Sequence, residues 1–277
     1  MIKYLFILLY FCIGSYSFAF YHEFKVDSLP KNVNVLYLRD ALRYLSLASN
    51  QEEIIDATFN TDSNIKSKLL TFSKEGIRVL IIKDLSSNVQ IVNIISLRNA
   101  EDLYHASIAT TNQGQLFTFP VNSYYATIYA EIREVIIRNI NRGVVKINTL
   151  GTASTYGTLL AIELSSLQIP VESIILFGGT RFTDQKTQDG ISNTFGLKML
   201  AVTHEYDLSH KMQMKKGYAE TLMNEFIICE NKNCNDTVFQ QTHFTINELL
   251  KHFSNTPHKH ATIYHDSLLK YNEKRNY

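Results

Sequence analysis

Short β-branched runs alternate with segments whose apolar residues recur every three or four positions, and this alternation constrains the fold most strongly. Ile77–Ile82 and Val89–Leu97 are runs of the first kind, separated by a polar turn, and they predict a pair of strands. Farther along, strands and helices follow one another, which is typical of parallel strands joined by crossover helices. The sequence therefore predicts an α/β sheet with at least some parallel pairing.

The remaining elements are predicted from caps, breakers and apolar stripes. An early helix is expected near Val35–Ala48, because Leu38, Leu42 and Leu45 share one helical face. A long helix follows later in the chain: Asn122 or Ser123 caps it, Gly143 ends it, and its apolar stripe is formed by Ile128, Ile132, Val135, Ile136 and Ile140. The elements predicted after it are a strand at Val144–Ile147, a turn at Gly151–Gly157, a helix at Thr158–Leu167 ended by Pro170, and strands at Val171–Phe177 and Leu197–His204. No internal repeat or linker is visible, so we expect one domain.

The amino terminus has the pattern of a secretory signal peptide. The apolar run Tyr4–Ile13 is too short to span a bilayer, and Ser17 and Ala19 have the small side chains expected before a cleavage site. Residues 1–19 are therefore predicted to be removed and residues 20–277 to form the mature domain, which is expected to be secreted and extracellular. An uncleaved signal anchor is the alternative.

Two cysteines remain in the predicted mature chain, Cys229 and Cys234, and they lie close together in a polar stretch. In an oxidising compartment they are expected to form a disulfide that closes a small loop. The sequon at Asn235 follows at once, which is consistent with an exposed loop. A free cysteine pair is the alternative if the signal prediction is wrong.

Charge and composition exclude several classes of function. Lys and Arg number 27 against 26 Asp and Glu, for a net charge of +1, so no strongly basic surface favours nucleic acid as the partner. Three cysteines are too few for a zinc module of paired CxxC motifs. His258 and His260 have no Cys or carboxylate at ligand spacing, so no metal site is expected.

Candidate catalytic residues follow the predicted strands, where open α/β sheets place their sites. Ser154 lies in the small-residue turn after Val144–Ile147, where a serine can expose its Oγ beside the amides of a helix start. Asp207 follows a later strand, and His265 lies near the end of the chain. The order Ser, Asp, His is that of the α/β-hydrolases.

Over Val35–Tyr271 the chain resembles the class 3 (fungal-type) lipase family. Phe177–Arg181 is similar to the family's Phe-Gly-x-Pro-Arg motif, with Thr180 in place of proline, and Val202–Asp207 is similar to its aspartate strand. Ile94–Leu103 resembles the segment that carries the oxyanion hole and leads into a lid. The resemblance implies a single α/β-hydrolase-type domain with a mostly parallel sheet and helices on both faces.

The resemblance also implies a mechanism and a substrate class. His265 would take the proton from Ser154 and Asp207 would orient the imidazole, with His260 as the rival base. The amides of Ala100 and Thr155 would bind the oxyanion. The implied function is a secreted lipase that hydrolyses acylglycerols or related lipid esters, at a membrane or lipid-droplet interface and without a cofactor.

Departures from the family pattern keep other interpretations open. With Ser154 as nucleophile, Thr152 and Tyr156 replace the glycines at −2 and +2, so Tyr156 must point out of the turn or open it. Gly157 then keeps the family's glycine at +3, which favours this register, whereas the alternative register places Ala153 at the nucleophile position and predicts a dead lipase. Two alternatives to an active lipase therefore stay open. One is an impaired lipase-fold protein that binds lipid or a protein partner, and the other is an unrelated secreted α/β binding protein.

Overall fold

The computed structural model describes residues 35–59, 62–73, 76–97, 99–113, 116–204, 207, 225–228, 264, 266 and 268. The predicted signal peptide, the Cys229–Cys234 pair and the candidate bases His260 and His265 lie outside the described residues. No helix among the described residues is long and apolar enough to cross a membrane.

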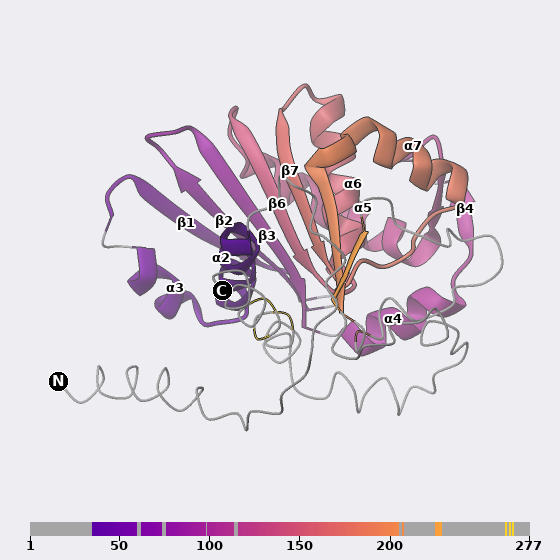
Figure 1. The fold of residues 1–277 in the computed structure, drawn as a ribbon, viewed down its shortest axis with the longest axis horizontal. Coiled ribbons are helices and arrows are strands. Elements are labelled where there is room, and N and C mark those ends of the chain that lie inside the picture. The colour runs from indigo at the N-terminus through magenta and orange to yellow at the C-terminus, as the bar shows by residue number, and fades with distance from the viewer. Residues whose placement is uncertain are drawn as a thin grey trace, which may run out of the picture.

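A seven-stranded sheet forms the centre of the structure (Figure 1). Its strands, in spatial order, are β1 (Ile65–Thr71), β2 (Ile77–Asp84), β3 (Val89–Ser96), β6 (Val144–Leu150), β7 (Val171–Phe177), β8 (Met199–His204) and β9 (Glu225–Ile228). The first three pair antiparallel, and every pair from β3 to β9 is parallel. The predicted mostly parallel α/β sheet is confirmed, and so is the predicted strand pair. A small second sheet joins β4 (Thr111–Gln113) to β5 (Pro120–Asn122).

Helices cover both faces of the large sheet (Figure 1). They are α2 (Val35–Ala48), α3 (Glu52–Phe59), α4 (Asn99–Ile108), α5 (Ser123–Arg138), α6 (Ala153–Ser166) and α7 (Gln185–Phe195), with a 3₁₀ turn η1 (Gly196–Lys198) before β8. The connections that contain α5, α6 and α7 carry the chain between successive parallel strands. Each of these crossovers returns the chain to the same end of the sheet, so the carboxyl ends of β3 and β6–β9 share one edge.

Two hydrophobic clusters fill the space between the sheet and its two helical layers. Residues on opposite faces of a strand enter opposite clusters: in β6, Ile147 packs with α5 and α6, whereas Leu150 packs with α2. The predicted stripe of Leu38, Leu42 and Leu45 is fully buried on the α2 side. The parallel strands are apolar on both faces because both faces are covered.

Helix α5 begins and packs largely as predicted. The side chain of Asn122 caps it by accepting the Tyr124 N–H at 3.0 Å, and Ile128, Ile132 and Ile136 are buried. Val135, predicted in the stripe, is 42% exposed and lies at the margin of the buried face of the helix.

Helix α6 starts at Ala153, five residues before the predicted start at Thr158. Gly157, expected in a turn, lies inside the helix, against β6. A Cβ at this position would lie 2.2 Å from Cγ2 of Thr149 and 3.2 Å from Cγ2 of Ile147. The glycine thus lets the helix approach the strand closely. The true strand-to-helix turn is reduced to Gly151 and Thr152.

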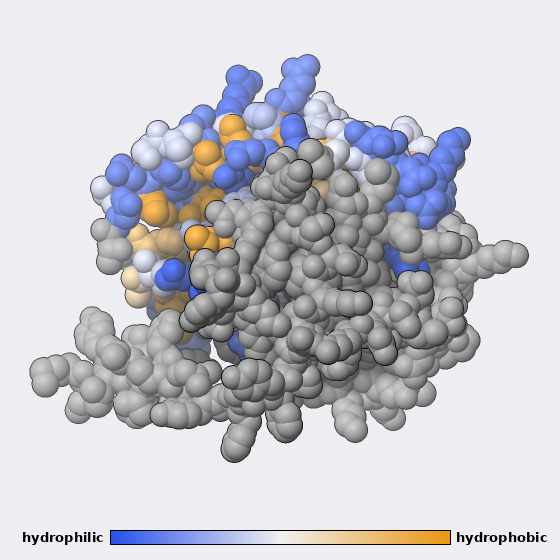
Figure 2. All heavy atoms as spheres, in the orientation of Figure 1, coloured by the Kyte–Doolittle hydropathy of each residue, from blue (hydrophilic) through white to orange (hydrophobic). Residues whose placement is uncertain are grey.

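The surface over the antiparallel part of the sheet mixes apolar and polar side chains. Figure 2 shows hydrophobic residues among hydrophilic ones on the side where Figure 1 draws β1–β3, α2 and α3. Leu36 on α2 and Ile54 on α3 are among the exposed large apolar residues. Single exposed apolar residues of this kind are usual on globular proteins.

Candidate active site

The turn between β6 and α6 is built around Gly151. This residue follows the last residue of the strand, has φ +63°, and donates its N–H to the carbonyl of Phe177 at 2.7 Å. Among the described non-glycine residues, positive φ occurs only at Asn88 and Gln168, both far from this turn in the sequence. The strained position of the strand-to-helix turn is therefore held by a glycine, whose backbone adopts it at little cost.

Ser154 lies in the first turn of α6 and is 2% exposed. Its Oγ accepts the N–H of Thr180 at 2.8 Å and shares a hydrogen bond with the Thr180 hydroxyl at 3.0 Å. Its own N–H donates to the carbonyl of Gly151 at 3.0 Å. The hydrogen bonds that the described residues give this hydroxyl hold it inside the fold.

Thr180 follows β7 and contacts both candidate residues at the start of α6. Its hydroxyl also hydrogen-bonds the Thr155 hydroxyl at 2.8 Å. Proline has no N–H, so a proline here could not make the bond from the Thr180 backbone to Ser154. The sequence shows that Thr180 replaces the proline of the lipase motif. Its hydrogen bonds to Ser154 could not be predicted without the positions of β6 and β7.

Asp207 is 1% exposed and lies three residues beyond β8. Its N–H donates to the carbonyl of His204 at 2.8 Å, and its Oδ2 accepts a hydrogen bond from the Tyr264 hydroxyl. The N–H of His204 donates to the same hydroxyl at 3.2 Å. The structure thus brings the candidate acid to the residue that precedes His265, the candidate base.

Tyr264 is a residue of the candidate site that the sequence pattern does not single out. Its ring is fully buried and packs edge-on against Phe177, at 5.4 Å between centroids, and against His204, at 5.9 Å. A buried tyrosine needs a partner for its hydroxyl, and here the carboxylate of Asp207 supplies one. Its position beside the candidate histidine was the available sequence signal.

Asp102 joins the helix that carries Ala100 to the rest of the site. This buried carboxylate accepts hydrogen bonds from the hydroxyls of Ser96, Tyr124 and Thr152, the last two at 2.9 and 3.4 Å. These donors come from the end of β3, the start of α5 and the turn before α6. A buried carboxylate with three hydroxyl donors fixes α4 at the carboxyl edge of the sheet.

The two residues predicted to bind the oxyanion lie at the starts of two helices. Ala100 is the second residue of α4, and Thr155 is the third of α6. The N–H of Thr155 points back along the chain to the carbonyl of Thr152, at 3.4 Å. Their assignment to the oxyanion hole stays a prediction, as does the triad as a whole.

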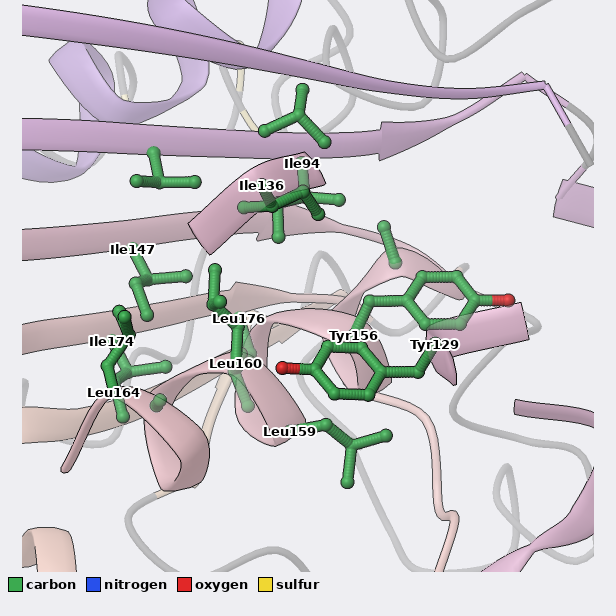
Figure 3. Close-up of a cluster of buried hydrophobic side chains, with 14 of the residues drawn as sticks. Ile94, Tyr129, Ile136, Ile147, Tyr156, Leu159, Leu160, Leu164, Ile174 and Leu176 are labelled. Atoms are coloured by element: carbon green, nitrogen blue, oxygen red, sulfur yellow. The ribbon is translucent and has the colours of Figure 1, made fainter. Parts of the chain in front are cut away.

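Tyr156 does not disturb the turn. Its side chain points into the core between α5 and α6, where it lies near Tyr129, Leu159 and Leu160 (Figure 3). It is fully buried and packs edge-on against Tyr125 at 5.6 Å. The ring therefore leaves the turn, but it enters the core rather than solvent, and the crowding expected from the sequence is absent.

An open cavity of about 420 Å³ lies between α4 and the start of α5. It is lined by His105, Ile108, Ala109, Ser123, Tyr124, Thr127 and Ile128. The His105 ring stacks on Tyr124 at 5.5 Å. Of the candidate catalytic residues that the structure describes, Ser154 and Asp207, neither lines this cavity.

The sequence matches no protein-family model and no curated protein. The structure is similar to the triacylglyceride lipase of Rhizomucor miehei, with a TM-score of 0.59 and 11% identity over 85% of this chain and 99% of that chain. It is also similar to a lipase of Rhizopus microsporus var. chinensis (TM-score 0.53, 14% identity, 83% and 95% covered) and to Lip2 lipase of Yarrowia lipolytica (TM-score 0.52, 13% identity, 83% and 96% covered). At these identities the similarity shows a shared lipase fold.

Proposed function

We propose that this protein binds lipid esters or their acyl products at the carboxyl edge of its lipase-type sheet, without turning them over at the rate of a lipase. The fold shared with lipases supports the lipid class of the ligand. One observation carries the loss of turnover: the Ser154 hydroxyl is buried and accepts the Thr180 N–H.

The chemistry of acyl transfer explains why this observation matters. A serine nucleophile must present a lone pair to the carbonyl carbon and its proton to a base within hydrogen-bond reach. At Ser154 the Thr180 N–H occupies one of the two lone pairs, and the hydrogen bond shared with the Thr180 hydroxyl takes up either the other lone pair or the proton. The shared bond must break before the residue can attack an ester.

The proposal is tested on the purified full-length chain with a fluorophosphonate probe, nitrophenyl esters of short and medium chain length, and emulsified triacylglycerol. We expect no labelling and no turnover, while native mass spectrometry detects bound lipid in the same sample. Ser154→Ala should leave the bound lipid unchanged. Protein that carries no lipid and takes up none from mixed micelles would contradict the proposal.

Hydrolysis through Ser154, Asp207 and His265 is the second candidate, and the hydrogen bond from Tyr264 to Asp207 favours it. In this mechanism His265 takes the proton as Ser154 Oγ attacks the carbonyl, and Asp207 orients the imidazole. The amides of Ala100 and Thr155 bind the oxyanion, and water hydrolyses the acyl-enzyme.

Two variants separate the candidates. If the triad acts, wild-type protein labels with the phosphonate, Ser154→Ala abolishes turnover, and Thr180→Val raises it by removing the competing hydroxyl. If the protein only binds lipid, neither variant changes a turnover that is already absent.

The proposed function includes a place and a surface of action. The amino-terminal pattern supports a secreted protein, and the ligand class supports action at a membrane or lipid-droplet surface. The near-zero net charge gives no support for nucleic acid as a partner.

A further inference from the structure

We propose that Gly151 occupies the position from which the nucleophile of this fold acts, so that the chain keeps the backbone of the catalytic turn and lacks its side chain. This inference rests on the proposed function and deepens it. It assigns the ligand as an intact ester or a free fatty acid that is held with its carbonyl group above Gly151.

The first observation is conformational. In α/β-hydrolases the nucleophile sits on a sharp, strained turn that joins a strand directly to a helix. Here Leu150 ends the strand, Gly151 has φ +63°, and the helix begins at Ala153. Ser154 is one helical turn farther on, inside regular helix, and therefore does not occupy the strained position.

The second observation is the position of this turn in the sheet. β6 is the central strand of the seven, and Gly151 is tied to the next strand through its N–H to the Phe177 carbonyl. Asp207 follows β8, two strands away on the same edge, and is buried and hydrogen-bonded. The candidate acid and the strained turn are thus both present. What the chain lacks is a side-chain hydroxyl at position 151.

A consequence for the ligand follows. A glycine cannot form an acyl-enzyme, because it has no atom that could bond to the carbonyl carbon. An ester held at this turn is not cleaved through it, and the site becomes one for retention of a lipid rather than its turnover.

The inference is tested by restoring the hydroxyl. In Gly151→Ser, the new Oγ should attack the phosphorus of a fluorophosphonate: an O–P bond forms, the P–F bond breaks, fluoride leaves, and the proton passes to the predicted base, His265. We expect labelling about 100-fold or more faster than in wild type, because general-base assistance contributes about 10²–10⁴-fold. Adding Asp207→Asn should abolish this gain.

Two matched variants control the experiment. Ala153→Ser places the same hydroxyl in the first turn of α6 and should not label. Gly151→Ala carries the same backbone strain without a hydroxyl. It should lower the melting temperature by about 2–8 °C, as should Gly151→Ser, since both force a side chain into the left-handed region.

The outcomes distinguish this inference from the proposed function. A folded Gly151→Ser that labels no faster than Ala153→Ser overturns the inference, while lipid bound to wild type leaves the proposed function standing. Wild-type labelling at Ser154 overturns both. If Gly151→Ser does not fold, Gly151→Cys is alkylated with iodoacetamide across pH. If this thiol reacts at the rate of a free cysteine, and Asp207→Asn does not change that rate, the result would count against the inference.

Discussion

At the scale of single residues, hydroxyl groups hold the candidate site together. Thr180 links Ser154 to Thr155, and the Tyr264 hydroxyl links Asp207 to the end of β8. Each of these hydroxyls is buried and has lost its hydrogen bonds to water. The bonds within the protein take the place of those bonds. These bonds connect the start of α6 to the segment after β7, and Asp207 to the end of β8.

The Tyr264 hydroxyl should stabilise the fold through its bond to a carboxylate. Tyr264→Phe keeps the ring and removes the bond, and we expect the free energy of unfolding at pH 7 to fall by about 1.5–3 kcal/mol, as for hydrogen bonds to charged groups. Urea unfolding followed by circular dichroism measures the change. Tyr37→Phe is the control, because among the described residues that hydroxyl bonds a neutral one, on Ser173 at 2.7 Å, and its loss should cost about 0.5–1.5 kcal/mol. Equal losses in the two variants would count against a charged interaction at Asp207.

Tyr156 contributes to stability, not to the chemistry of the turn. If the ring crowded the turn, Tyr156→Gly would relieve that crowding; because the ring is buried in the core, the substitution is instead a core deletion. Tyr156→Ala should lower the free energy of unfolding by about 3–5 kcal/mol. Thermal unfolding measures this, with the exposed Tyr104→Ala expected within about 0.5 kcal/mol of wild type. A Tyr156 variant as stable as wild type would place the ring outside the core.

At the scale of elements, the close packing of α6 on β6 places the strand-to-helix turn. Because Gly157 has no side chain, the helix rests directly on Thr149 and Ile147. A larger residue would push the start of α6 away from the sheet, and Ser154 and Gly151 would move with it. The geometry of the site thus depends on a glycine that takes no part in its chemistry.

Gly157→Ala should destabilise the protein by about 1–3 kcal/mol, because its Cβ would lie 2.2 Å from Cγ2 of Thr149. Thr149→Ser in the same background removes that methyl group and should recover part of the loss. Gly190→Ala in α7 is the matched control: beyond its own helix backbone, no atom of the described residues lies within 4 Å of a Cβ at this position, and alanine should stabilise the helix by about 0.5–1 kcal/mol. A Gly157→Ala protein as stable as the Gly190→Ala protein would contradict the close approach.

The turn between β2 and β3 should make stability depend on pH. Hydrogen bonds from the hydroxyls of Ser86 and Ser87, both at 2.6 Å, lower the pKa of Asp84 to about 2. Since the pKa is lowered on folding, the contribution is fully present above the unfolded value near 4 and is lost as the pH falls through about 2. The stability gap between wild type and Ser86→Ala/Ser87→Ala should therefore close between about pH 4 and 2.

Thr194→Ala is the control for this titration, because its hydroxyl donates to a backbone carbonyl, on Gly190, which does not titrate. The gap between wild type and this variant should not change over the same pH range. If the stability difference from wild type closed for both variants over this pH range, the loss of stability in acid would not arise from the protonation of Asp84.

The elements that the sequence predicts best are those whose patterns are local. The stripe of α2, the strand pair β2–β3 and the Asn122 cap of α5 are each visible within one segment. The start of α6 was missed, because Gly157 looks like a turn residue until its neighbour on β6 is known. For the site, the sequence offers Asp207 as a candidate acid but does not indicate its bond to Tyr264, since that contact joins residues 57 positions apart.

At the scale of the whole molecule, secretion and the small loop closed by Cys229 and Cys234 stay predictions about residues outside the described part. Protein recovered from culture medium should begin at Phe20 and contain one disulfide. Mass spectrometry of unreduced peptides should show the Cys229–Cys234 fragment about 2 Da lighter than after reduction. Two free thiols, or an intact amino terminus, would contradict the secretory interpretation.

The spatial order of the large sheet follows the order of its strands along the chain, from β1 to β9. Each strand therefore lies beside one that precedes it, and no later strand has to insert between two that are already paired. During synthesis, which proceeds from the amino terminus, each emerging strand finds its partner already made, and the local hairpins β1–β2–β3 come first. The sheet can then grow from its antiparallel edge as the chain lengthens, so that its assembly follows the direction of translation.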